Sequence, residues 1–418
     1  NDGRVRSPRT NTTGEESTLM PAQVVTQKSR GFICVNAHPE GCARNVERQV
    51  AAAGAVVKGA RRPGIRNALV IGGSTGYGLA SRVALGWGYG ASTLGVFFER
   101  APEGDRTGTA GWYNTVAFHR SAQRDGLRAA SLNADAFSDQ AKQTACEILK
   151  REMGPVDLVV YSLASPKRLH PRTGLVHNSV LKPIGKAYTN KTIDLSTRKI
   201  QEITVQPASE QEIADTVAVM GGEDWKFWIE TLAAEGLLAE GARTVAYSYI
   251  GPTLTWPIYW DGTIGRAKIH LEKTAAELDD LLAGRVKGQA WISVNKAIVT
   301  QASAAIPVVP LYMSLLFKVM KQEEIDEDAA GQMRRLYLDV CAPGKTLVLD
   351  GNHRIRMDDR EMRADVQAEV SMLWPQVTSE NLLEVSDFAG FDRGFKNLFG
   401  FDVEGVDYSK PVETDVRW

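Results

Sequence analysis

Three observations predict an α/β fold built on a doubly wound parallel sheet. Short apolar runs alternate with longer amphipathic segments between residues 65 and 165, as in βαβ units. A glycine-rich turn follows the first of these runs. The chain has 418 residues, of which 43% are hydrophobic and 24% charged, and this composition excludes disordered, collagen-like and coiled-coil classes.

Apolar runs mark the expected strands in chain order. Four strands of the first half are expected at residues 67–71, 93–98, 130–133 and 156–163, separated by segments long enough for crossover helices. The polar segment 166–209 contains four prolines and one strand-like run, 200–205. The later elements are expected to be a helix at 210–238, a strand at 244–250, a helix at 264–282, a strand at 290–299, and a mostly helical tail with a strand-like run at 346–349.

The length allows one or two domains, and we expect one extended domain over residues 20–418. Residues 1–19 are polar and lack an apolar segment, so they are expected to be a disordered leader added ahead of a native start at Met20, and not a signal peptide. The insertion at about 166–240 is expected to cover the substrate, because long segments of this kind are usually functional. Residues from about 320 to 418 are expected to form a C-terminal helical extension.

Charge and cysteine content limit the partners and the compartment. With 49 basic and 50 acidic residues the net charge is −1, so neither nucleic acid nor an anionic membrane is an expected partner. Four scattered cysteines do not form a disulfide framework and indicate a reducing compartment, which predicts a cytoplasmic protein.

Two local patterns could be mistaken for functional segments. The 21 uncharged residues between Lys296 and Lys318 are long enough to cross a membrane, but Pro307 and Pro310 interrupt them, so a buried strand-to-helix element is expected instead. Cysteines 34 and 42 flank a histidine at position 38, but a fourth ligand is missing, and no metal site is predicted.

The glycine turn is the first candidate binding site. It reads Gly72-Gly73-Ser74-Thr75-Gly76-Tyr77-Gly78 and lies between an expected strand and a helix-compatible segment. Glycines let backbone N–H groups approach a pyrophosphate at a helix N-terminus, as in Rossmann-like folds. The spacing departs from G-x-G-x-x-G and resembles the variant of the short-chain dehydrogenases/reductases. A tight turn also needs glycines when no ligand is bound, so this reading stays open.

The ends of the next strands supply further candidates. Glu99 follows the second strand, 23 residues after Gly76, where an acidic residue binds the adenosine ribose and favours NAD over NADP. Asp135 and Ala136 close the third strand, and Leu163 and Ala164 follow the fourth. A solvated strand end or ordinary turn chemistry is the alternative for each of them.

Tyr259 and Lys268 are the candidate catalytic pair. Nine residues at about 100° each would place the two side chains on opposite faces of one helix. Pro257 and the turn-like Asp261-Gly262-Thr263 instead predict Tyr259 on a loop and Lys268 on the following helix, from which both can reach one ligand.

These residues resemble a known family, the FabV/TER-type trans-2-enoyl-ACP (CoA) reductases, which are NADH-dependent and have a Tyr-x8-Lys site. The resemblance extends from about residue 30 to 408 through separate blocks, including Phe97-Phe98-Glu99-Arg100, Tyr161-Ser162-Leu163-Ala164-Ser165-Pro166 and Met220-Gly221-Gly222-Glu223-Asp224-Trp225. It implies reduction of enoyl-ACP or enoyl-CoA in fatty acid elongation by a monomer.

The resemblance also implies individual roles. Tyr259 would donate a proton, Lys268 would bind the cofactor and support the oxyanion, and Tyr249 would lie on the substrate side. The NAD contacts that it implies come from Gly72, Gly73, Ser74, Thr75, Gly76, Tyr77, Phe98, Glu99, Asp135, Ala136, Leu163, Ala164, Lys268, Ile298, Val299 and Thr300.

The implied reaction delivers hydride to the β-carbon of an enoyl thioester. Tyr259 is expected to stabilise the thioester oxyanion, with Lys268 lowering the pKa of the phenol. Residues 300–317 are expected to be a wall of the acyl site or a plain core helix, and Lys167 and Arg168 are candidates for phosphate contacts. A carbonyl reductase and a redox-sensing NAD-binding module are the competing interpretations.

Overall fold

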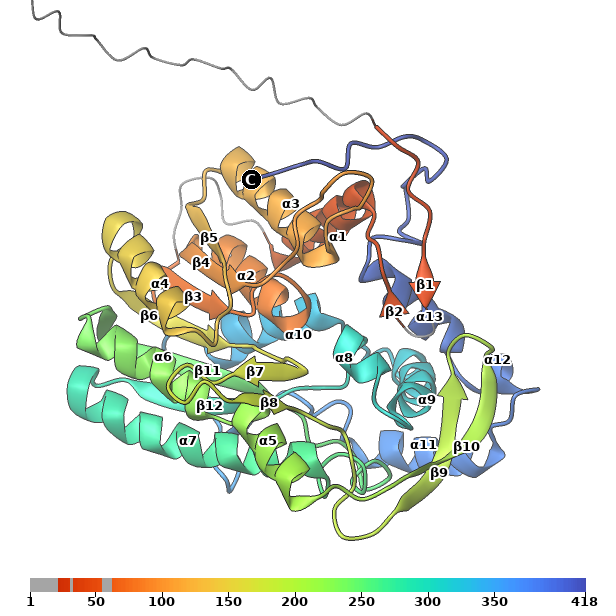
Figure 1. Cartoon of the computed structure of the whole chain (residues 1–418). Helices are drawn as coiled ribbons and strands as arrows, with labels where there is room; N and C mark the ends of the chain where they lie inside the picture. Colours follow the sequence, from red (N-terminus) through yellow and green to blue (C-terminus); the bar gives the residue numbers. More distant parts are fainter. Residues whose placement is uncertain (1–21, 31–32, 55–61) are drawn as a thin grey trace, which may run out of the picture.

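The computed structural model describes residues 22–30, 33–54 and 62–418 (Figure 1). The expected leader, residues 1–19, lies outside this part of the chain. A seven-stranded sheet with the strand order β13-β12-β11-β6-β3-β4-β5 forms the centre, and every neighbouring pair is parallel. The strands are β3 (Asn67–Ile71), β4 (Ser92–Phe97), β5 (Ala129–Asn133), β6 (Val156–Tyr161), β11 (Leu238–Ser248), β12 (Gln289–Val294) and β13 (Arg354–Arg356). The predicted α/β fold with a doubly wound sheet is confirmed.

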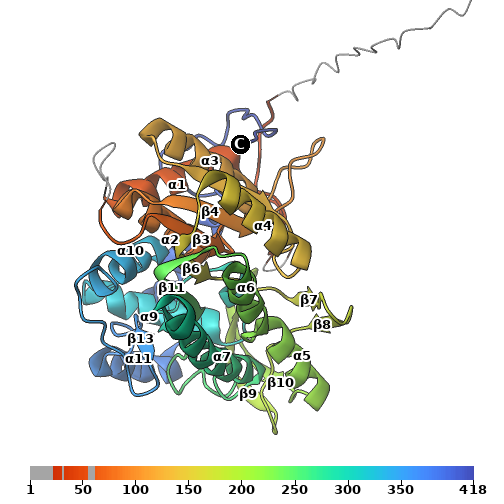
Figure 2. The same ribbon diagram turned by 90° about the vertical axis from the view of Figure 1, so that its left-hand side faces the viewer.

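Helices cover both faces of this sheet, because its strands are buried on both sides. On one face lie α4 (Asp139–Glu152), α6 (Glu223–Ala234) and α7 (Thr263–Val286), which pack Leu149, Trp228 and Leu278 against it. On the other face lie α2 (Gly76–Tyr89), α3 (Ala110–Asp125), α10 (Ala329–Arg335) and the π-helical turn η1 (Leu336–Val340). Helix α1 (Pro39–Ala53) packs outside α2 and α3, and the short strands β1 (Ser29–Arg30) and β2 (Ile33–Cys34) precede it. Figure 2 shows α6 and α7 side by side.

The insertion contains two hairpins and one helix before α6. The hairpins are β7 (Lys167–Leu169) with β8 (Val176–Asn178), and β9 (Tyr188–Asp194) with β10 (Lys199–Val205), and the helix is α5 (Glu210–Met220). The helical segment expected over 210–238 consists of two helices, because Gly221 and Gly222 separate α5 from α6 (Glu223–Ala234). A Cβ at Gly222 would lie 2.1 Å from the Thr274 hydroxyl, so glycine allows the chain to approach α7 closely.

The C-terminal extension packs around a buried helix. Helix α9 (Val309–Gln322) carries Leu311, Tyr312 and Leu316, which are fully buried. The short helix α8 (Gln301–Ala304) precedes it, and α11 (Ala364–Gln376), α12 (Leu382–Val385) and α13 (Phe388–Asn397) belong to the extension. Residues 309–317 therefore belong to a core helix.

In this part of the chain one strand prediction is wrong and another is right in place but too long. The expected strand at 346–349 is irregular, and the strand that joins the sheet is β13. Strand β12 ends at Val294, so residues 298–300 lie in the connection to α8 and not in the strand.

The insertion packs against α9 and against the C-terminal extension. Strand β9 lies beside α9 (Figure 1), and the Val308 N–H donates to the Thr192 hydroxyl over 3.2 Å. The Lys191 ammonium donates to three carbonyl oxygens at the end of α11, where a positive charge complements the helix dipole. These contacts place the insertion against the extension rather than in open solvent.

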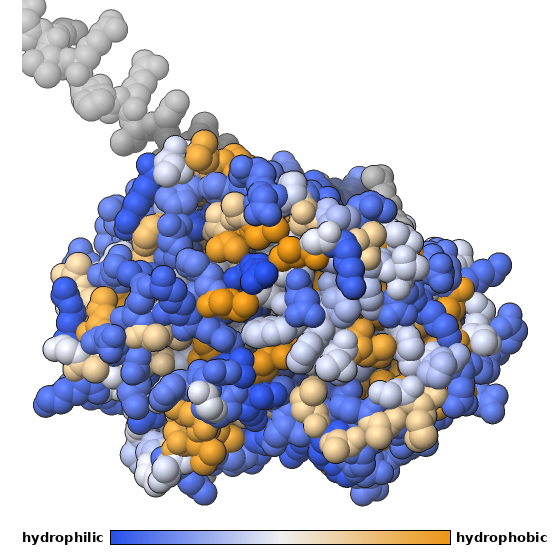
Figure 3. Space-filling model, turned by 90° about the horizontal axis from the view of Figure 1, so that it is seen from below, coloured by the Kyte–Doolittle hydropathy of each residue, from blue (hydrophilic) through white to orange (hydrophobic). Residues whose placement is uncertain are grey.

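Hydrophilic side chains dominate the face shown in Figure 3, and hydrophobic ones occur there in small separate groups. In the described ranges no helix combines the length and the apolar character that crossing a membrane requires. The same ranges contain no cluster of three or more metal-binding side chains.

Candidate active site

The candidate residues follow the carboxyl ends of six neighbouring strands, which together form one edge of the sheet: β12, β11, β6, β3, β4 and β5. In open α/β sheets this edge is the place where ligands bind.

Close packing of the backbone explains two of the glycines in the turn at residues 72–78. A Cβ at Gly72, whose φ is +84°, would lie 2.1 Å from the Ser162 carbonyl oxygen, and one at Gly78 would lie 2.0 Å from the Gly72 carbonyl oxygen. Both glycines are therefore required by the fold itself.

The turn also leaves backbone donors at the N-terminus of α2. Thr75 is the N-cap, and its side chain makes no capping hydrogen bond. A Cβ at Gly76 would have Thr300 Cγ2 as its nearest neighbour, 3.8 Å away, so Thr300 lies beside this turn. The Tyr77 hydroxyl points away from it and donates to the Lys296 carbonyl oxygen over 2.5 Å. Backbone N–H groups, and not the Tyr77 phenol, are thus the available phosphate ligands.

Glu99 is held by its neighbours rather than solvated. Its carboxylate accepts hydrogen bonds from the Ser74 hydroxyl over 2.6 Å and from the Thr109 hydroxyl, and burial raises its pKa. The Asn133 side chain bonds both the N–H and the carbonyl oxygen of Glu99, at 2.7 and 2.8 Å. Phe98, beside it, is 80% exposed. Asn133 and Thr109 were not predicted from the sequence, although Asn133 is a polar residue at the end of a strand and could have been found by that signal.

The end of β5 is fixed by a buried ion pair. Lys142 and Asp224 are each 1% exposed and are joined over 2.8 Å. Lys142 also donates to the carbonyl oxygens of Ala136 and Phe137. Asp135 itself is exposed. The pair therefore holds the backbone at 136–137 while Asp135 faces solvent.

Two further segments complete the edge of the sheet. After β6, Leu163 is half-buried and Ala164 exposed, and after β12, Ile298 is buried while Val299 and Thr300 are half-buried. The Thr300 hydroxyl accepts from the Ser303 N–H over 3.0 Å and so caps α8.

Tyr259 and Lys268 lie on a turn and a helix, as predicted. The Tyr259 carbonyl oxygen accepts from the N–H groups of Gly262 and Gly265, which fixes the turn to the start of α7. Lys268 is 9% exposed, and its ammonium donates to the Tyr247 carbonyl oxygen over 3.0 Å. Burial lowers the pKa of Lys268 to about 8.

The expected acidification of the Tyr259 phenol is not observed. Burial raises the pKa of Tyr259, and the Lys268 ammonium is bound to a carbonyl instead of the phenol. The phenol therefore keeps its proton at neutral pH and is a hydrogen-bond donor. Ten of the eleven tyrosine hydroxyls in the chain take part in hydrogen bonds within the described structure, and Tyr259 is the exception.

Tyr249 lies against Tyr259 and is anchored from behind. The two rings meet edge to face with centroids 5.0 Å apart. The Tyr249 hydroxyl donates to Glu361 Oε1 over 2.9 Å. Sequence reasoning missed Glu361, because a single carboxylate 112 residues away carries no spacing signal.

The candidate phosphate contacts differ from each other. Arg168 is buried and donates to Glu223 and to the Ala218 carbonyl oxygen, so it is not available to a substrate phosphate. Lys167 is exposed.

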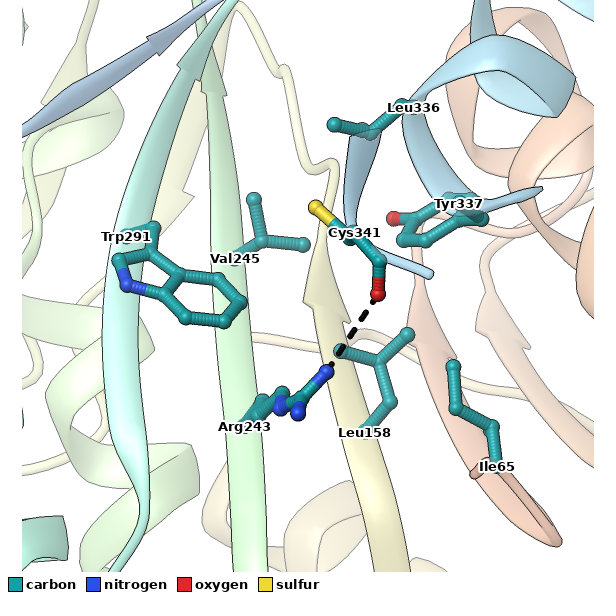
Figure 4. A pocket seen from close by; sticks show the side chains of 8 residues that line it. All are labelled: Ile65, Leu158, Arg243, Val245, Trp291, Leu336, Tyr337 and Cys341. Carbon is teal, nitrogen blue, oxygen red and sulfur yellow. Dashed lines mark hydrogen bonds between the residues drawn. The ribbon is translucent and has the colours of Figure 1, made fainter. Parts of the chain in front are cut away.

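A small apolar pocket lies elsewhere, between the sheet and η1 (Figure 4). Arg243 crosses it and donates to the Cys341 carbonyl oxygen over 3.5 Å. None of the candidate site residues lines this pocket, whose walls are formed by Ile65, Leu158, Arg243, Val245, Trp291, Leu336, Tyr337 and Cys341.

Three family models match this chain in succession. Residues 24–104 match the "NAD(P)H binding domain of trans-2-enoyl-CoA reductase", and residues 106–341 match the "Trans-2-enoyl-CoA reductase catalytic region". Residues 349–412 match the "Enoyl reductase FAD binding domain".

Whole-chain relatives agree with these matches. Proteins of Coxiella burnetii (strain RSA 331) and Cytophaga hutchinsonii, both named enoyl-[acyl-carrier-protein] reductase [NADH], are 53% and 52% identical to this chain. Each match covers 94% of this chain, and 96% and 98% of the respective relative.

Solved structures give the same result. Trans-2-enoyl-CoA reductases from Treponema denticola, in complex with NAD, and from a Clostridium species, in complex with NADH, superpose with TM-scores of 0.89 and 0.90. They are 47% and 41% identical, and each match covers 94% of this chain and 98% of the other.

Proposed function

Because this chain belongs to the trans-2-enoyl-CoA reductase family, we propose that it reduces the trans-2 double bond of enoyl thioesters with NADH, using Tyr259 and Lys268. The uncommitted Tyr259 hydroxyl is the observation that carries this assignment of residues. The Tyr259 side chain is 8% exposed, but its hydroxyl is not one of the fully enclosed side-chain atoms that lack a partner, so a hydrogen-bond partner on a ligand can reach it. The thioester oxygen of an enoyl substrate is such a partner.

The two residues have separate tasks in the proposed reaction. Bound NADH supplies the hydride that reduces the β-carbon. Tyr259 donates a hydrogen bond to the thioester oxygen as negative charge develops there, which in comparable sites is worth about 2.7–4 kcal/mol. Lys268, held at the Tyr247 carbonyl, presents a positive charge to the cofactor and to the oxyanion. The α-carbon is then protonated by Tyr259 or by solvent.

The proposed NADH site follows the edge of the sheet. Backbone N–H groups of the glycine turn bind the pyrophosphate, and Glu99 binds the adenosine ribose. The Glu99 carboxylate would repel the 2′-phosphate of NADPH. The remaining proposed contacts come from Phe98, Asp135, Ala136, Leu163, Ala164, Lys268, Ile298, Val299 and Thr300.

A flavin does not fit the segment that matches the FAD-binding model. In this chain residues 349–412 place Val366, Phe388 and Phe391 in the core around α9. They contain no strand, glycine turn and helix in succession comparable to residues 67–89. A flavin therefore has no part in the proposed reaction.

Several finer assignments belong to the same proposal. Either CoA or an acyl carrier protein carries the acyl chain, and the exposed Lys167 is available to a phosphate of the carrier. The protein acts as a cytoplasmic monomer, with residues 20–418 forming one extended domain in which the insertion at 166–240 covers the substrate. The net charge of −1 supports the absence of nucleic acid and membrane partners.

The test is NADH oxidation with a short trans-2-enoyl-CoA, run beside NADPH and beside a 3-ketoacyl-CoA. Turnover is expected with NADH and the enoyl substrate only. Turnover with the keto substrate alone would identify a carbonyl reductase, and NADH binding without any turnover would identify a binding module.

A further inference from the structure

A completely buried carboxylate lies behind the proposed active site. Glu361 is 0% exposed and comes from the turn between β13 and α11. Its Oε1 accepts from the hydroxyls of Tyr249 and Tyr312, at 2.9 and 2.7 Å, and its Oε2 accepts from the Ala297 N–H at 2.7 Å. Burying a carboxylate costs free energy unless hydrogen-bond donors surround it, and these three donors offset that cost.

The three donors come from distant parts of the chain. Tyr249 follows β11, Ala297 follows β12, and Tyr312 lies on α9. Gln367 on α11 closes the cluster by donating to the Glu361 carbonyl oxygen over 2.7 Å and to the Tyr312 hydroxyl over 3.1 Å. Glu361 is therefore the point at which the C-terminal extension contacts both the substrate side and the connection after β12.

Glu361 contacts one residue beside the proposed substrate, Tyr249, and one residue beside the proposed NADH contacts, Ala297. Tyr249 meets the ring of Tyr259 edge to face, so fixing the Tyr249 hydroxyl also limits the position of the Tyr259 ring. Ala297 precedes the proposed cofactor contacts Ile298, Val299 and Thr300, the last of which lies beside the glycine turn. A shift of Ala297 would move these contacts.

We propose that Glu361 is a positioning residue that aligns the enoyl thioester and NADH with each other by anchoring Tyr249 on one side and Ala297 on the other. This inference rests on the proposed function. The Tyr249 hydroxyl has one proton and donates it to Glu361, so Tyr249 orients the substrate and Tyr259 alone donates to the oxyanion. In this proposal residues 349–412, which include Glu361, position the substrate and NADH without binding a flavin.

Glu361→Gln tests this role, with Tyr312→Phe as the matched control. Gln keeps the size of the side chain but places an NH₂ group against either the phenols or the Ala297 N–H. We expect KM for the enoyl thioester and Kd for NADH, measured by fluorescence, to rise about fivefold or more, which is the value of about one hydrogen bond. Tyr312→Phe removes a donor from the same oxygen and is expected to lower Tm while leaving KM and Kd within about twofold. Unchanged constants in Glu361→Gln, or equal changes in both variants, would overturn the proposal.

A double variant separates the two sides of the cluster. In a Tyr249→Phe background, Glu361→Gln is expected to raise KM no further but still to raise Kd for NADH. Additive effects on KM would contradict the coupling through Tyr249. If Glu361→Gln does not fold, Glu361→Asp, which retracts the carboxylate by one methylene, provides the same comparison.

The NADH measurement also separates this inference from the proposed function. If the wild-type protein reduces no enoyl thioester, the proposed function fails. The effect of Glu361→Gln on NADH binding is then still measurable, and an unchanged Kd would show that the Ala297 side of the inference fails as well.

Discussion

The first half of the sheet, β3 to β6, differs from the second half, β11 to β13 with its extension, in how the site residues are held. In the first half Glu99 is bound by residues at or after the ends of neighbouring strands, Ser74, Thr109 and Asn133. In the second half the partners are remote, since Tyr249 is bound by Glu361. The position of Glu99 is thus set by the ends of adjacent strands, whereas the position of Tyr249 depends on a residue of the C-terminal extension.

The largest effect is expected on kcat, from a variant of Tyr259, which follows β11 in the second half of the sheet. Tyr259→Phe removes the proposed donor to the oxyanion, and we expect kcat to fall by about 100- to 1000-fold. Kd for NADH is expected to stay unchanged, because the phenol is not a ligand of the glycine turn. Steady-state kinetics and a fluorescence titration measure both quantities, and near-normal turnover would show that Tyr259 is not the donor.

The next largest effect is expected on stability, from a variant of the glycine turn after β3, in the first half of the sheet. Gly72→Ala places a Cβ 2.1 Å from the Ser162 carbonyl oxygen at a φ of +84°, so we expect a loss of about 3 kcal/mol in the free energy of unfolding and weak NADH binding. Gly284→Ala, on α7, is the control, since a Cβ there meets nothing within 4 Å and alanine favours a helix. Chemical denaturation of the two variants compares them directly. Equal stabilities would contradict the close approach of the turn to β6.

A smaller effect is expected at Glu99. Glu99→Ala removes the negative charge that would face a 2′-phosphate, and we expect the ratio of kcat/KM for NADH to that for NADPH to fall about tenfold. The measurement is the ratio itself, because the loss of the Ser74 and Thr109 hydrogen bonds affects both cofactors. If the ratio does not change, Glu99 serves only the fold.

The smallest effect is a pH dependence. Burial lowers the pKa of Lys268 to about 8, so its ammonium form is lost as the pH rises through that value. We expect kcat/KM of the free enzyme to be constant at pH 6 to 7, about half-maximal near pH 8, and to fall further above it. The Tyr259 phenol, whose pKa is raised, stays protonated over this range. A profile that stays flat to pH 10 would contradict a charged role for Lys268.

The sequence predicted the parts of this account that depend on local pattern. The strand at 67–71, the glycine turn, Glu99 after the second strand, and Tyr259 on a turn ahead of the Lys268 helix are all found in the structure. Each is specified by residues within one strand–turn–helix unit. The predicted roles of these residues remain to be tested by the variants above.

The errors arose where tertiary packing decides the outcome. The break between α5 and α6 depends on the contact of Gly222 with Thr274, and the pKa of Tyr259 depends on burial rather than on Lys268. Strand β13 has three residues and was missed because its pairing with β12 stabilises it. Glu361 was missed because its donors come from three distant segments.

The origin of the hydrogen at the β-carbon of the product decides whether this protein reduces an enoyl thioester with hydride from NADH. The wild-type protein would be given a short trans-2-enoyl-CoA and NADH carrying deuterium in the transferable position at nicotinamide C4, and the product would be analysed by mass spectrometry and NMR. We expect a saturated acyl-CoA with one deuterium on its β-carbon. An unreduced double bond, or a saturated product without deuterium at that carbon, would contradict it.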